Sequence, residues 1–595
     1  MRPACCGVAL LYVILGVPSP GAAPARSQGA AGQLNATVTE TLLGAFQSGG
    51  KFVVSPDGGH LATFSTHGSR EVIVVDGVDG PEFDDAGRPN PGSGVIDVAF
   101  SPDGKRSAYI AQKGDLWVAV VDGKEAFTVT GVKPNSSVPG IDQSYIHSSG
   151  EGHQPPRQFL FSQSGAHVAV VAQDPTGMYM FLDGVKSPAY TSIDLRQVVF
   201  VGDRLVYVAS TADHKWHAVV NTTPGPGYDR LASLQLSDNG QHFALIGSNG
   251  AASAIITGGA TGPAPPVITG TGVSDLVIAS TGQVGYLGAA GTSPHGPLKT
   301  PLYVGSQQVY ADTPAPFFGT FPGTGEQKSG VHIVFSPDGS KFAYAKQVPG
   351  GVAAVIDGKT SIAYDAIGQM HFSPDSKRAY FVGMKSGLEF VVIDGQEMQG
   401  QSRVGNIGFS ADGSRFGYES QTSVVIDGKE SGALRGLIEK SLTFSADGKH
   451  SAYVVCAQYT QCQLVKDGTA TPMTRPADFN TRTGPPHFTS PAVAFSPDGT
   501  RLVTNLDVHA VLIDGKEISH GASYEYPVFS PDSKHFAVMG WIKQAMTLFV
   551  DGATGPTYKD IVEANRNVVR FLDAHTLRFL AVKGDSVYRV VMDLK

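Results

Sequence analysis

The feature that most constrains this sequence is a five-residue cassette, Phe-Ser-Pro-Asp-Gly, that recurs along most of the chain. Its best copies, some with Ala in place of Pro or Ser in place of Gly, begin at Phe100, Phe335, Phe372, Phe409, Phe444, Phe495 and Phe529. Weaker copies lie at residues 55–58, 162–165, 202–203, 237–240, 280–282 and 573–575. Together they make about thirteen units, at the spacing of about 35 to 60 residues that is typical of propeller blades.

Each unit has the same internal order. An apolar strand ends at the Phe, and Pro-Asp-Gly then turns the chain, because Pro fixes φ, Asp bonds to the local backbone and Gly accepts a positive φ. A second strand follows, as at residues 341–345, and a third strand stops at Asp-Gly, as at residues 391–395 and 511–515. Asp-Gly between apolar runs is a strong hairpin signal, so a fourth strand is expected after it.

Four antiparallel strands per unit, with no helix between units, predict an all-β chain built of propeller blades. The competing architecture is an open β-solenoid, which needs shorter periods and no four-stranded meander. About thirteen blades exceed the usual four to eight of one ring, so the sequence predicts two tandem β-propellers of about 6 + 7 blades. Pro and Gly interrupt the pattern at residues 311–330, which places an N-terminal propeller at 36–315 and a C-terminal propeller at 325–595.

The N-terminus predicts export. Arg2 precedes an apolar run from Val8 to Val17, and small residues follow up to Ala25. This order is typical of a secretory signal peptide over residues 1–25, and the run is too short to span a bilayer. The alternative is a disordered or interfacial tail. No other segment is apolar enough to be transmembrane, so we expect a secreted or periplasmic protein.

Charge and cysteine content narrow the classes of partner. The net charge is −8 over 595 residues, without a Lys/Arg cluster, which disfavours nucleic acid as a partner. Cys456 and Cys462 flank an expected hairpin tip between two strand-like runs, where they would face each other closely enough for a disulfide. Two unpaired buried thiols are the alternative. A zinc site is disfavoured because no histidines lie nearby to complete it.

The cassette, followed by a short aromatic or β-branched strand, resembles the WD40-like repeats of the TolB propeller family. It is also similar to the propeller domains of tricorn-type and prolyl-oligopeptidase-type peptidases. The resemblance covers most of the mature chain, is strongest after Val331, and implies the fold far more than a function. The chain has no Trp-Asp dipeptide, and its repeats begin near Lys51, so the amino-terminal α/β domain of TolB is missing. Strand patterns continue to Met592, which leaves no room for the separate catalytic domain of the peptidases.

Two sets of residues are candidate binding sites. Long excursions at residues 81–94, 131–157, 258–272 and 470–489 are expected to emerge on one face, around the channel mouth. Their best anchors for a partner are aromatic or positively charged: Tyr145, His147, His153, Arg157, Arg475 and Phe479. The alternative is that these loops vary in length without a role.

The second set is the polar residue three positions before each cassette Phe. It comprises Asp97, Gln158, Gln197, His332, Gln369 and Asn406, with Ser233 and Ser441 in other units. On innermost strands these residues would either line a polar pocket at the channel mouth or solvate a water-filled channel.

Local catalytic motifs are absent from the sequence: it has no Gly-x-Ser-x-Gly, no His-Glu-x-x-His and no phosphate-binding loop. A divalent metal held in the channel by residues of different blades would leave no local motif, and Asp97, His332 and His371 are the first candidates for it. No other cofactor is expected. The leading prediction is a non-enzymatic scaffold that binds a protein or peptide through its loop-rich face. The alternatives are a propeller hydrolase or lyase with a channel metal, and a cell-envelope or carbohydrate-binding protein.

Overall fold

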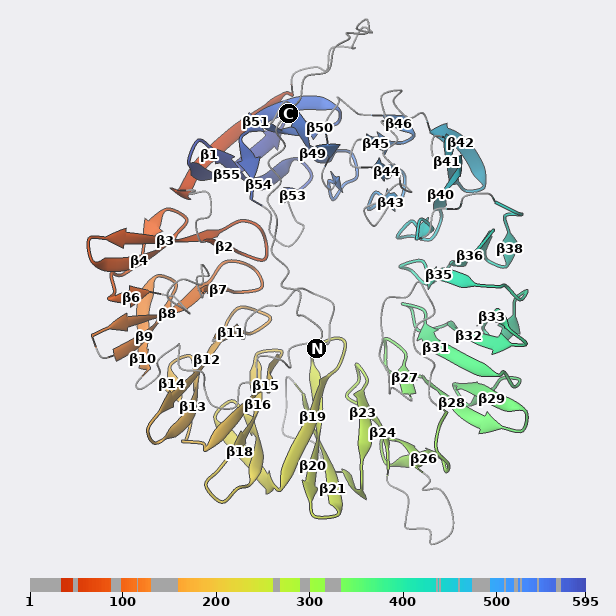
Figure 1. Cartoon of the computed structure of the whole chain (residues 1–595), viewed down its shortest axis with the longest axis horizontal. Coiled ribbons are helices and arrows are strands. Elements are labelled where there is room, and N and C mark those ends of the chain that lie inside the picture. Colours follow the sequence, from red (N-terminus) through yellow and green to blue (C-terminus); the bar gives the residue numbers. More distant parts are fainter. Residues whose placement is uncertain are drawn as a thin grey trace, which may run out of the picture.

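The computed structural model of the chain is an all-β ring of thirteen sheets (Figure 1). It describes residues 34–45, 52–86, 98–114, 116–129, 159–259, 268–288, 300–315, 333–434, 437, 440–458, 461–473, 493–507, 510–517, 523–524, 527–542, 545–562 and 569–595. Within these residues no helix is long and apolar enough to cross a membrane. The sheets are called blades 1 to 13 in chain order.

The first six blades contain the following strands. Blade 1 has β2 (Phe52–Val54), β3 (Leu61–His67), β4 (Arg70–Val75) and β5 (Val78–Asp79); blade 2 has β6 (Asp85–Ala86), β7 (Val98–Phe100), β8 (Ser107–Lys113), β9 (Leu116–Val121) and β10 (Lys124–Val129). Blade 3 has β11 (Phe159–Phe161), β12 (Val168–Asp174), β13 (Gly177–Leu182) and β14 (Val185–Lys186); blade 4 has β15 (Ser192–Val201), β16 (Arg204–Ser210), β17 (Trp216–Val220) and β18 (Thr223–Tyr228). Blade 5 has β19 (Arg230–Leu236), β20 (His242–Asn249), β21 (Ala252–Gly259) and β22 (Ile268–Thr271); blade 6 has β23 (Ser274–Ile278), β24 (Val284–Leu287), β25 (Leu302–Val304) and β26 (Gln307–Tyr310).

The other seven blades follow the same order. Blade 7 has β27 (Ile333–Phe335), β28 (Phe342–Val348), β29 (Gly351–Ile356) and β30 (Lys359–Thr360); blade 8 has β31 (Ala366–Phe372), β32 (Ala379–Lys385), β33 (Leu388–Ile393) and β34 (Gln396–Glu397). Blade 9 has β35 (Val404–Phe409), β36 (Phe416–Ser420), β37 (Val424–Ile426) and β38 (Lys429–Glu430); blade 10 has β39 (Thr443–Phe444), β40 (Ser451–Gln458), β41 (Gln461–Lys466) and β42 (Thr469–Met473). Blade 11 has β43 (Val493–Phe495), β44 (Leu502–Asp507), β45 (Ala510–Ile513) and β46 (Lys516–Glu517); blade 12 has β47 (Ser523–Tyr524), β48 (Val528–Phe529), β49 (Phe536–Ile542), β50 (Ala545–Val550) and β51 (Ala553–Tyr558). Blade 13 has β52 (Asp560–Ile561), β53 (Val569–Phe571), β54 (Thr576–Lys583), β55 (Ser586–Leu594) and, as its outermost strand, β1 (Ala36–Ala45).

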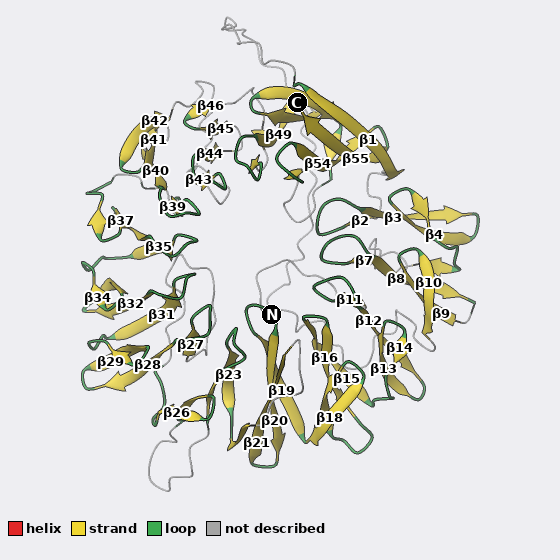
Figure 2. Ribbon diagram, turned by 180° about the vertical axis from the view of Figure 1, so that it is seen from behind, coloured by secondary structure: helices red, strands yellow, loops and turns green. Residues whose placement is uncertain are grey.

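The predicted four-stranded antiparallel blade is confirmed. Strands pair with their sequence neighbours, and each cassette or its weaker copy makes the turn from the first strand to the second. The first strands lie toward the centre of the ring and the fourth strands at its outer edge (Figures 1 and 2). The Asp-Gly turns connect third and fourth strands, as expected, and the Asp takes a positive φ that a two-residue hairpin turn requires, for example 51° at Asp122 and at Asp394.

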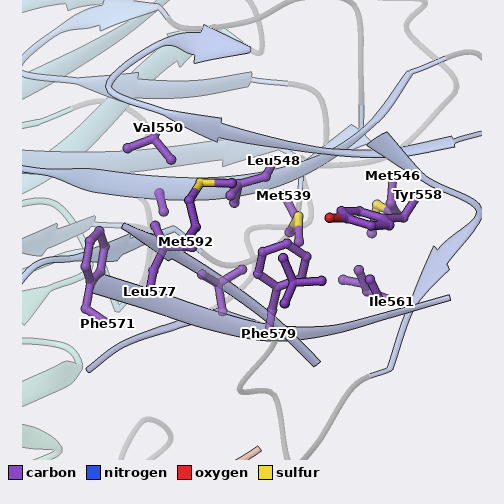
Figure 3. Close-up of a cluster of buried hydrophobic side chains, with 14 residues drawn as sticks. Met539, Met546, Leu548, Val550, Tyr558, Ile561, Phe571, Leu577, Phe579 and Met592 are labelled. Atoms are coloured by element: carbon purple, nitrogen blue, oxygen red, sulfur yellow. The ribbon is translucent and has the colours of Figure 1, made fainter. Parts of the chain in front are cut away.

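A buried hydrophobic cluster lies between every pair of neighbouring blades. Between blades 12 and 13, for example, Met539 and Leu548 pack with Phe579 and Met592 (Figure 3). Because β-branched and aromatic side chains alternate along each strand, both faces of a blade are apolar and each is covered by a neighbour. The core of this protein is therefore a circle of interfaces between blades.

The structure does not show two separate rings. One of the clusters joins Leu302 and Val304 of blade 6 to Ile333 and Tyr344 of blade 7, across the predicted boundary at residues 311–330. The apolar faces on the two sides of this Pro- and Gly-rich stretch pack on each other as at any other interface, and all thirteen blades follow one circle (Figure 1). A division into six and seven blades stays a prediction.

The circle is closed by the N-terminal strand. β1 pairs antiparallel with β55 from Ala36↔Leu594 to Ala45↔Ser586, and it is the outermost strand of the last blade. Leu43 of β1 is fully buried in the cluster shared by blades 13 and 1. The phenol of Tyr558 donates a hydrogen bond to Glu40 at 3.0 Å, and the Lys583 ammonium lies 2.8 Å from the same carboxylate. Chain ends more than five hundred residues apart thus form one sheet.

Separation of the chain into 26–315 and 325–595 tests this closure. In one ring, the first fragment carries β1 without β55, and the second leaves blade 13 without its outer strand. We expect neither fragment alone to unfold cooperatively, and the two together to reassociate, as measured by thermal melting and size-exclusion chromatography. Two fragments that each fold as stable monomers would instead establish the two-ring arrangement.

Two adjacent leucines of β1 provide a matched pair of variants. Leu43→Ala opens a cavity at the closing interface and should lower the free energy of unfolding by about 2 to 4 kcal/mol. Leu42→Ala, at a side chain that is 53% exposed, should change it by less than about 0.5 kcal/mol. Denaturant unfolding followed by fluorescence measures both; equal effects would show that β1 does not close the ring.

Candidate functional site

The ring has two faces with different connections. Because neighbouring strands run in opposite directions, the cassette turns lie on one face of the ring, together with the connections between third and fourth strands, such as the Asp-Gly turns. We call it the cassette face. The turns between second and third strands lie on the opposite face, together with the connections between blades. We call it the connection face.

Each cassette is a self-contained hydrogen-bonded turn. In blade 2, the buried Ser101 hydroxyl donates to Asp103 at 2.7 Å and accepts a hydrogen bond from the backbone N–H of Arg106 at 3.0 Å. The Asp103 carboxylate also accepts from the N–H of Lys105. The same Ser-to-Asp hydrogen bond recurs at Ser336, Ser373, Ser410, Ser445, Ser496 and Ser530. The Ser-to-Asp hydrogen bond is therefore kept even where Ala replaces Pro or Ser replaces Gly in the cassette.

These hydrogen bonds stabilise the charged form of the cassette carboxylates. The hydrogen bond from Ser101 lowers the pKa of Asp103 to about 2, and that from Ser373 lowers the pKa of Asp375 to about 2. At Asp498, the N–H of Thr500 is the largest cause of a pKa lowered to about 2. The cassette aspartates are thus ionised structural groups and have the wrong pKa for general acid–base catalysis near neutral pH.

The residue five positions after the cassette Ser fastens the blade to the next one. Arg106 donates from Nε to Asp122 of its own Asp-Gly turn at 3.0 Å, and from Nη1 to the carbonyls of Gly165 and Ala166 in the next cassette turn. Its guanidinium also lies 5.7 Å from the ring centroid of Phe161 in that blade. Arg378, Arg415 and Arg501 repeat this arrangement, and His60, His167, His450 and His535 replace the arginine in other blades.

The connection face has its own repeated element, which sequence reasoning missed. An aromatic residue just before the next blade inserts between the blades and meets a ring of its second strand edge-on: Phe83 with Tyr109, Tyr190 with Tyr207, Tyr364 with Phe381 and Tyr558 with Phe579. In three blades an Asp follows the aromatic residue and accepts from an N–H of the neighbouring turn, as Asp365 does from Ser386 at 2.8 Å. The recurrent aromatic-Asp pair is the signal that could have identified it.

The predicted polar positions before the cassette Phe have a structural role where their side chains are described. Ladder irregularities occur there in several innermost strands, and Ser233, Asp275 and Asn406 take positive φ. Gln197 accepts a hydrogen bond from the N–H of Leu234 in the next blade at 3.3 Å. Asn406 donates to the carbonyl of Leu442 in the next blade at 3.0 Å. These amides bridge neighbouring blades at bulges.

A buried carboxylate accompanies Asn406. Glu419 of β36 is 4% exposed and accepts from the N–H groups of Lys440 and Leu442 and from the Asn406 amide. Burial raises its pKa, although these donors favour the charged form. Because the donors belong mainly to the next blade, Glu419 holds the interface between blades 9 and 10.

Other predicted site residues lie outside the residues that the structure describes. Asp97, Gln158 and His332 are outside the described residues, and of Gln369 only the backbone is described. The six loop residues, Tyr145, His147, His153, Arg157, Arg475 and Phe479, are also outside them. Their loops follow β10 and β42, the fourth strands of blades 2 and 10, so both excursions start from the connection face.

One excursion was assigned to the wrong face. Residues 260–267 lie between β21 and β22, the third and fourth strands of blade 5, which places this connection on the cassette face. The sequence analysis expected the excursion at residues 258–272 to emerge with the other three around the channel mouth. The other three predicted excursions, at residues 81–94, 131–157 and 470–489, contain or begin the connections that follow β5, β10 and β42, the fourth strands of their blades.

On the connection face of blade 4, a carboxylate and an imidazole, those of Asp213 and His217, both lie within hydrogen-bond distance of the Thr211 hydroxyl. Thr211-Ala212-Asp213-His214-Lys215 repeats the cassette turn there, with Thr211 donating to Asp213. The Nε2 of His217 lies 3.0 Å from the Thr211 hydroxyl, and Nδ1 lies 2.8 Å from the carbonyl of Gly225. Since a carbonyl only accepts, Nδ1 carries a proton. The Thr211 hydroxyl donates its proton to Asp213, so this group serves to fix the turn between β16 and β17.

A metal site finds no support in the placed residues. Within the described ranges no group of three or more His, Cys, Asp or Glu side chains could hold a metal ion. His371 stacks on Tyr380 with ring centroids 5.0 Å apart. The other two candidates, Asp97 and His332, lie outside the described residues, so the channel metal stays a prediction.

The two late cysteines occupy one hairpin. Cys456 and Cys462 are Cα partners across β40 and β41, and Cys462 is disulfide-bonded. A disulfide is typical of an oxidising compartment.

Comparisons with known proteins add little beyond the strand topology. No protein-family model and no curated protein matches this chain. Among solved structures, a eukaryotic initiation factor is similar at TM-score 0.30 and 14% identity, covering 60% of this chain and 94% of that chain. The β-propeller domain of Cps50 (Swd1) from Myceliophteria thermophila gives TM-score 0.22 and 9% identity, covering 44% and 95%. The β-propeller domain of the Trilobed protease from Pyrococcus furiosus gives 0.22 and 9%, covering 44% and 90%. At these scores the fold assignment depends on the blades themselves.

The cassette carboxylates predict a specific acid sensitivity. A group whose pKa is lowered by folding contributes stability above its unfolded pKa of about 4, and this contribution is lost as pH falls through the folded pKa. With the pKa of Asp103, Asp375, Asp498 and Asp532 at about 2, the denaturant midpoint should fall steadily between pH 4 and 2. Asp375→Asn should lower the midpoint at pH 6 and make the fall below pH 4 shallower; a midpoint independent of pH in this window would contradict the assignment.

Proposed function

We propose that this protein is a secreted or periplasmic β-propeller scaffold that binds a protein or peptide partner on its connection face, without catalysis of its own. The observation that carries the proposal is a difference between the two faces: the cassette face consists of repeated turns, whereas the connection face contains long segments that do not repeat. On the cassette face, the repeated Ser, Asp, Arg and His side chains bond to one another and to the next blade, as Arg106 and Asp122 do. Their hydrogen-bonding capacity is used within the ring.

The connection face differs because its longest segments do not repeat. The connections after β10 and β42 are two of the long connections between blades, and they contain Tyr145, Arg157, Arg475 and Phe479. Tyr and Arg are over-represented among the residues that dominate binding energy, and functional residues concentrate on loops held by a rigid scaffold. Export of the chain is supported by the N-terminal pattern of residues 1–25 and by the disulfide at Cys462.

Loop replacement tests this proposal. Residues 132–156 and 476–488 would each be replaced by a short Gly-Ser linker, and residues 260–267 of the cassette face would be replaced in the same way as the matched control. A partner captured by crosslinking to the mature protein, then purified, should bind the control as it binds the unchanged protein. The connection-face variants should bind at least about tenfold more weakly, since loss of a central anchor costs about 2 kcal/mol. Weaker binding by the control alone would place the partner site on the cassette face.

A further inference from the structure

The closing strand β1 leaves part of its outer edge unpaired. It lies at the end of its sheet, with β55 on one side and no described strand on the other. Fourth strands in six blades have only two residues, for example β5 and β14, whereas β1 runs from Ala36 to Ala45. A long edge strand is a ready template for another strand.

The direction of the backbone groups along this edge follows from three contacts. The carbonyl of Asn35 accepts from the N–H of Lys595, so the groups of odd-numbered residues face β55. The N–H of Leu34 instead donates to Thr554 in blade 12, at 3.2 Å. The carbonyl of Leu42 faces the other neighbour, blade 1, where a Cβ built on Gly77 would lie 3.1 Å from it.

Neighbouring blades therefore cover the edge at Leu34 and at Leu42. Between these points, the N–H and C=O groups of Ala36, Val38 and Glu40 point outward, and the hydrogen bonds found among the described residues use none of them. The Val38 side chain is 40% exposed. The free edge is thus a short window of alternating outward residues centred on Val38.

We propose that this window pairs with the same window of a second copy of the chain, antiparallel about a two-fold axis at Val38. In this register Val38 of one copy lies opposite Val38 of the other. Ala36 of each copy lies opposite Glu40 of the other copy. The three residue pairs form about six hydrogen bonds, which use all the outward N–H and C=O groups of the window. Thr37 then lies opposite Thr39, a favourable cross-strand pair.

The charges of β1 select this register. An axis at Glu40 would place two carboxylates directly opposite each other, which destabilises a strand pair. With the axis at Val38, Glu40 faces Ala36 and keeps its contacts to Tyr558 and Lys583 in its own blade. Pairing with an extended peptide of another protein would not require the window to be self-complementary. This window is self-complementary, because pairing with its own copy about Val38 uses all its outward N–H and C=O groups.

Charge substitution on the axis tests the proposal. The interface is small, so the mature protein should show a reversible monomer–dimer equilibrium in sedimentation velocity between about 1 and 100 µM. Val38→Lys places two ammonium groups on the axis and should weaken dimerisation by about tenfold or more, as should Val38→Glu. Val78→Lys, at a 70% exposed valine of the edge strand β5, is the matched control and should dimerise as the unchanged protein does.

Mixing the two charge variants distinguishes a lost interface from a damaged fold. An equimolar mixture of Val38→Lys and Val38→Glu should recover dimer, because opposite charges then face each other, and a misfolded protein would not be rescued. The proposal is overturned by a mature protein that stays monomeric over the whole range, by a dimer that Val38→Lys does not weaken, or by a mixture that recovers no dimer.

Discussion

Every blade of this protein buries its two apolar faces against the blades on either side. Each blade therefore needs two neighbours, and a closed circle gives every blade both of them. A ring with one open interface would expose the faces of two blades to water at once. This constraint explains why the strand farthest from the C-terminus in sequence completes the last blade. β1 covers the end of the circle with Leu43 in the cluster shared by blades 13 and 1, and with the Glu40 carboxylate between Tyr558 and Lys583.

Between these hydrophobic interfaces, polar groups set how one blade sits on the next. The cassette serine and aspartate fix the first turn of a blade, and Arg106 and its counterparts reach from one Asp-Gly turn to the carbonyls of the following cassette. On the opposite face, aromatic residues such as Tyr190 and Tyr364 fill the wedge between blades. The same side chains that make the repeat visible in the sequence are therefore those that hold the ring together, and the proposed binding site lies in segments outside the repeat.

This division bears on both proposals. A partner on the connection face would meet loops that vary from blade to blade, while the cassette face presents nearly the same turns around the ring. Self-association through β1 uses neither face, because Val38 lies at the outer edge of blade 13. A dimer formed there would leave both faces open to partners.

The blade was predictable from the sequence because its determinants are local. The Pro-Asp-Gly and Asp-Gly turns, with apolar strands between them, determine four strands within about 40 residues, and the strand order agrees with that prediction. The sequence predicted a position near the channel mouth for Gln197 and Asn406 if their strands are innermost. It could not predict their contacts, since Leu234 and Leu442 belong to neighbouring blades. Tertiary structure alone decided the circular arrangement of thirteen blades, the pairing of β1 with β55, and the face on which β21 ends and β22 begins. These three features depend on packing between segments that are far apart in the chain. Local residue patterns show which strands have an apolar face, but they do not show which other face it packs against.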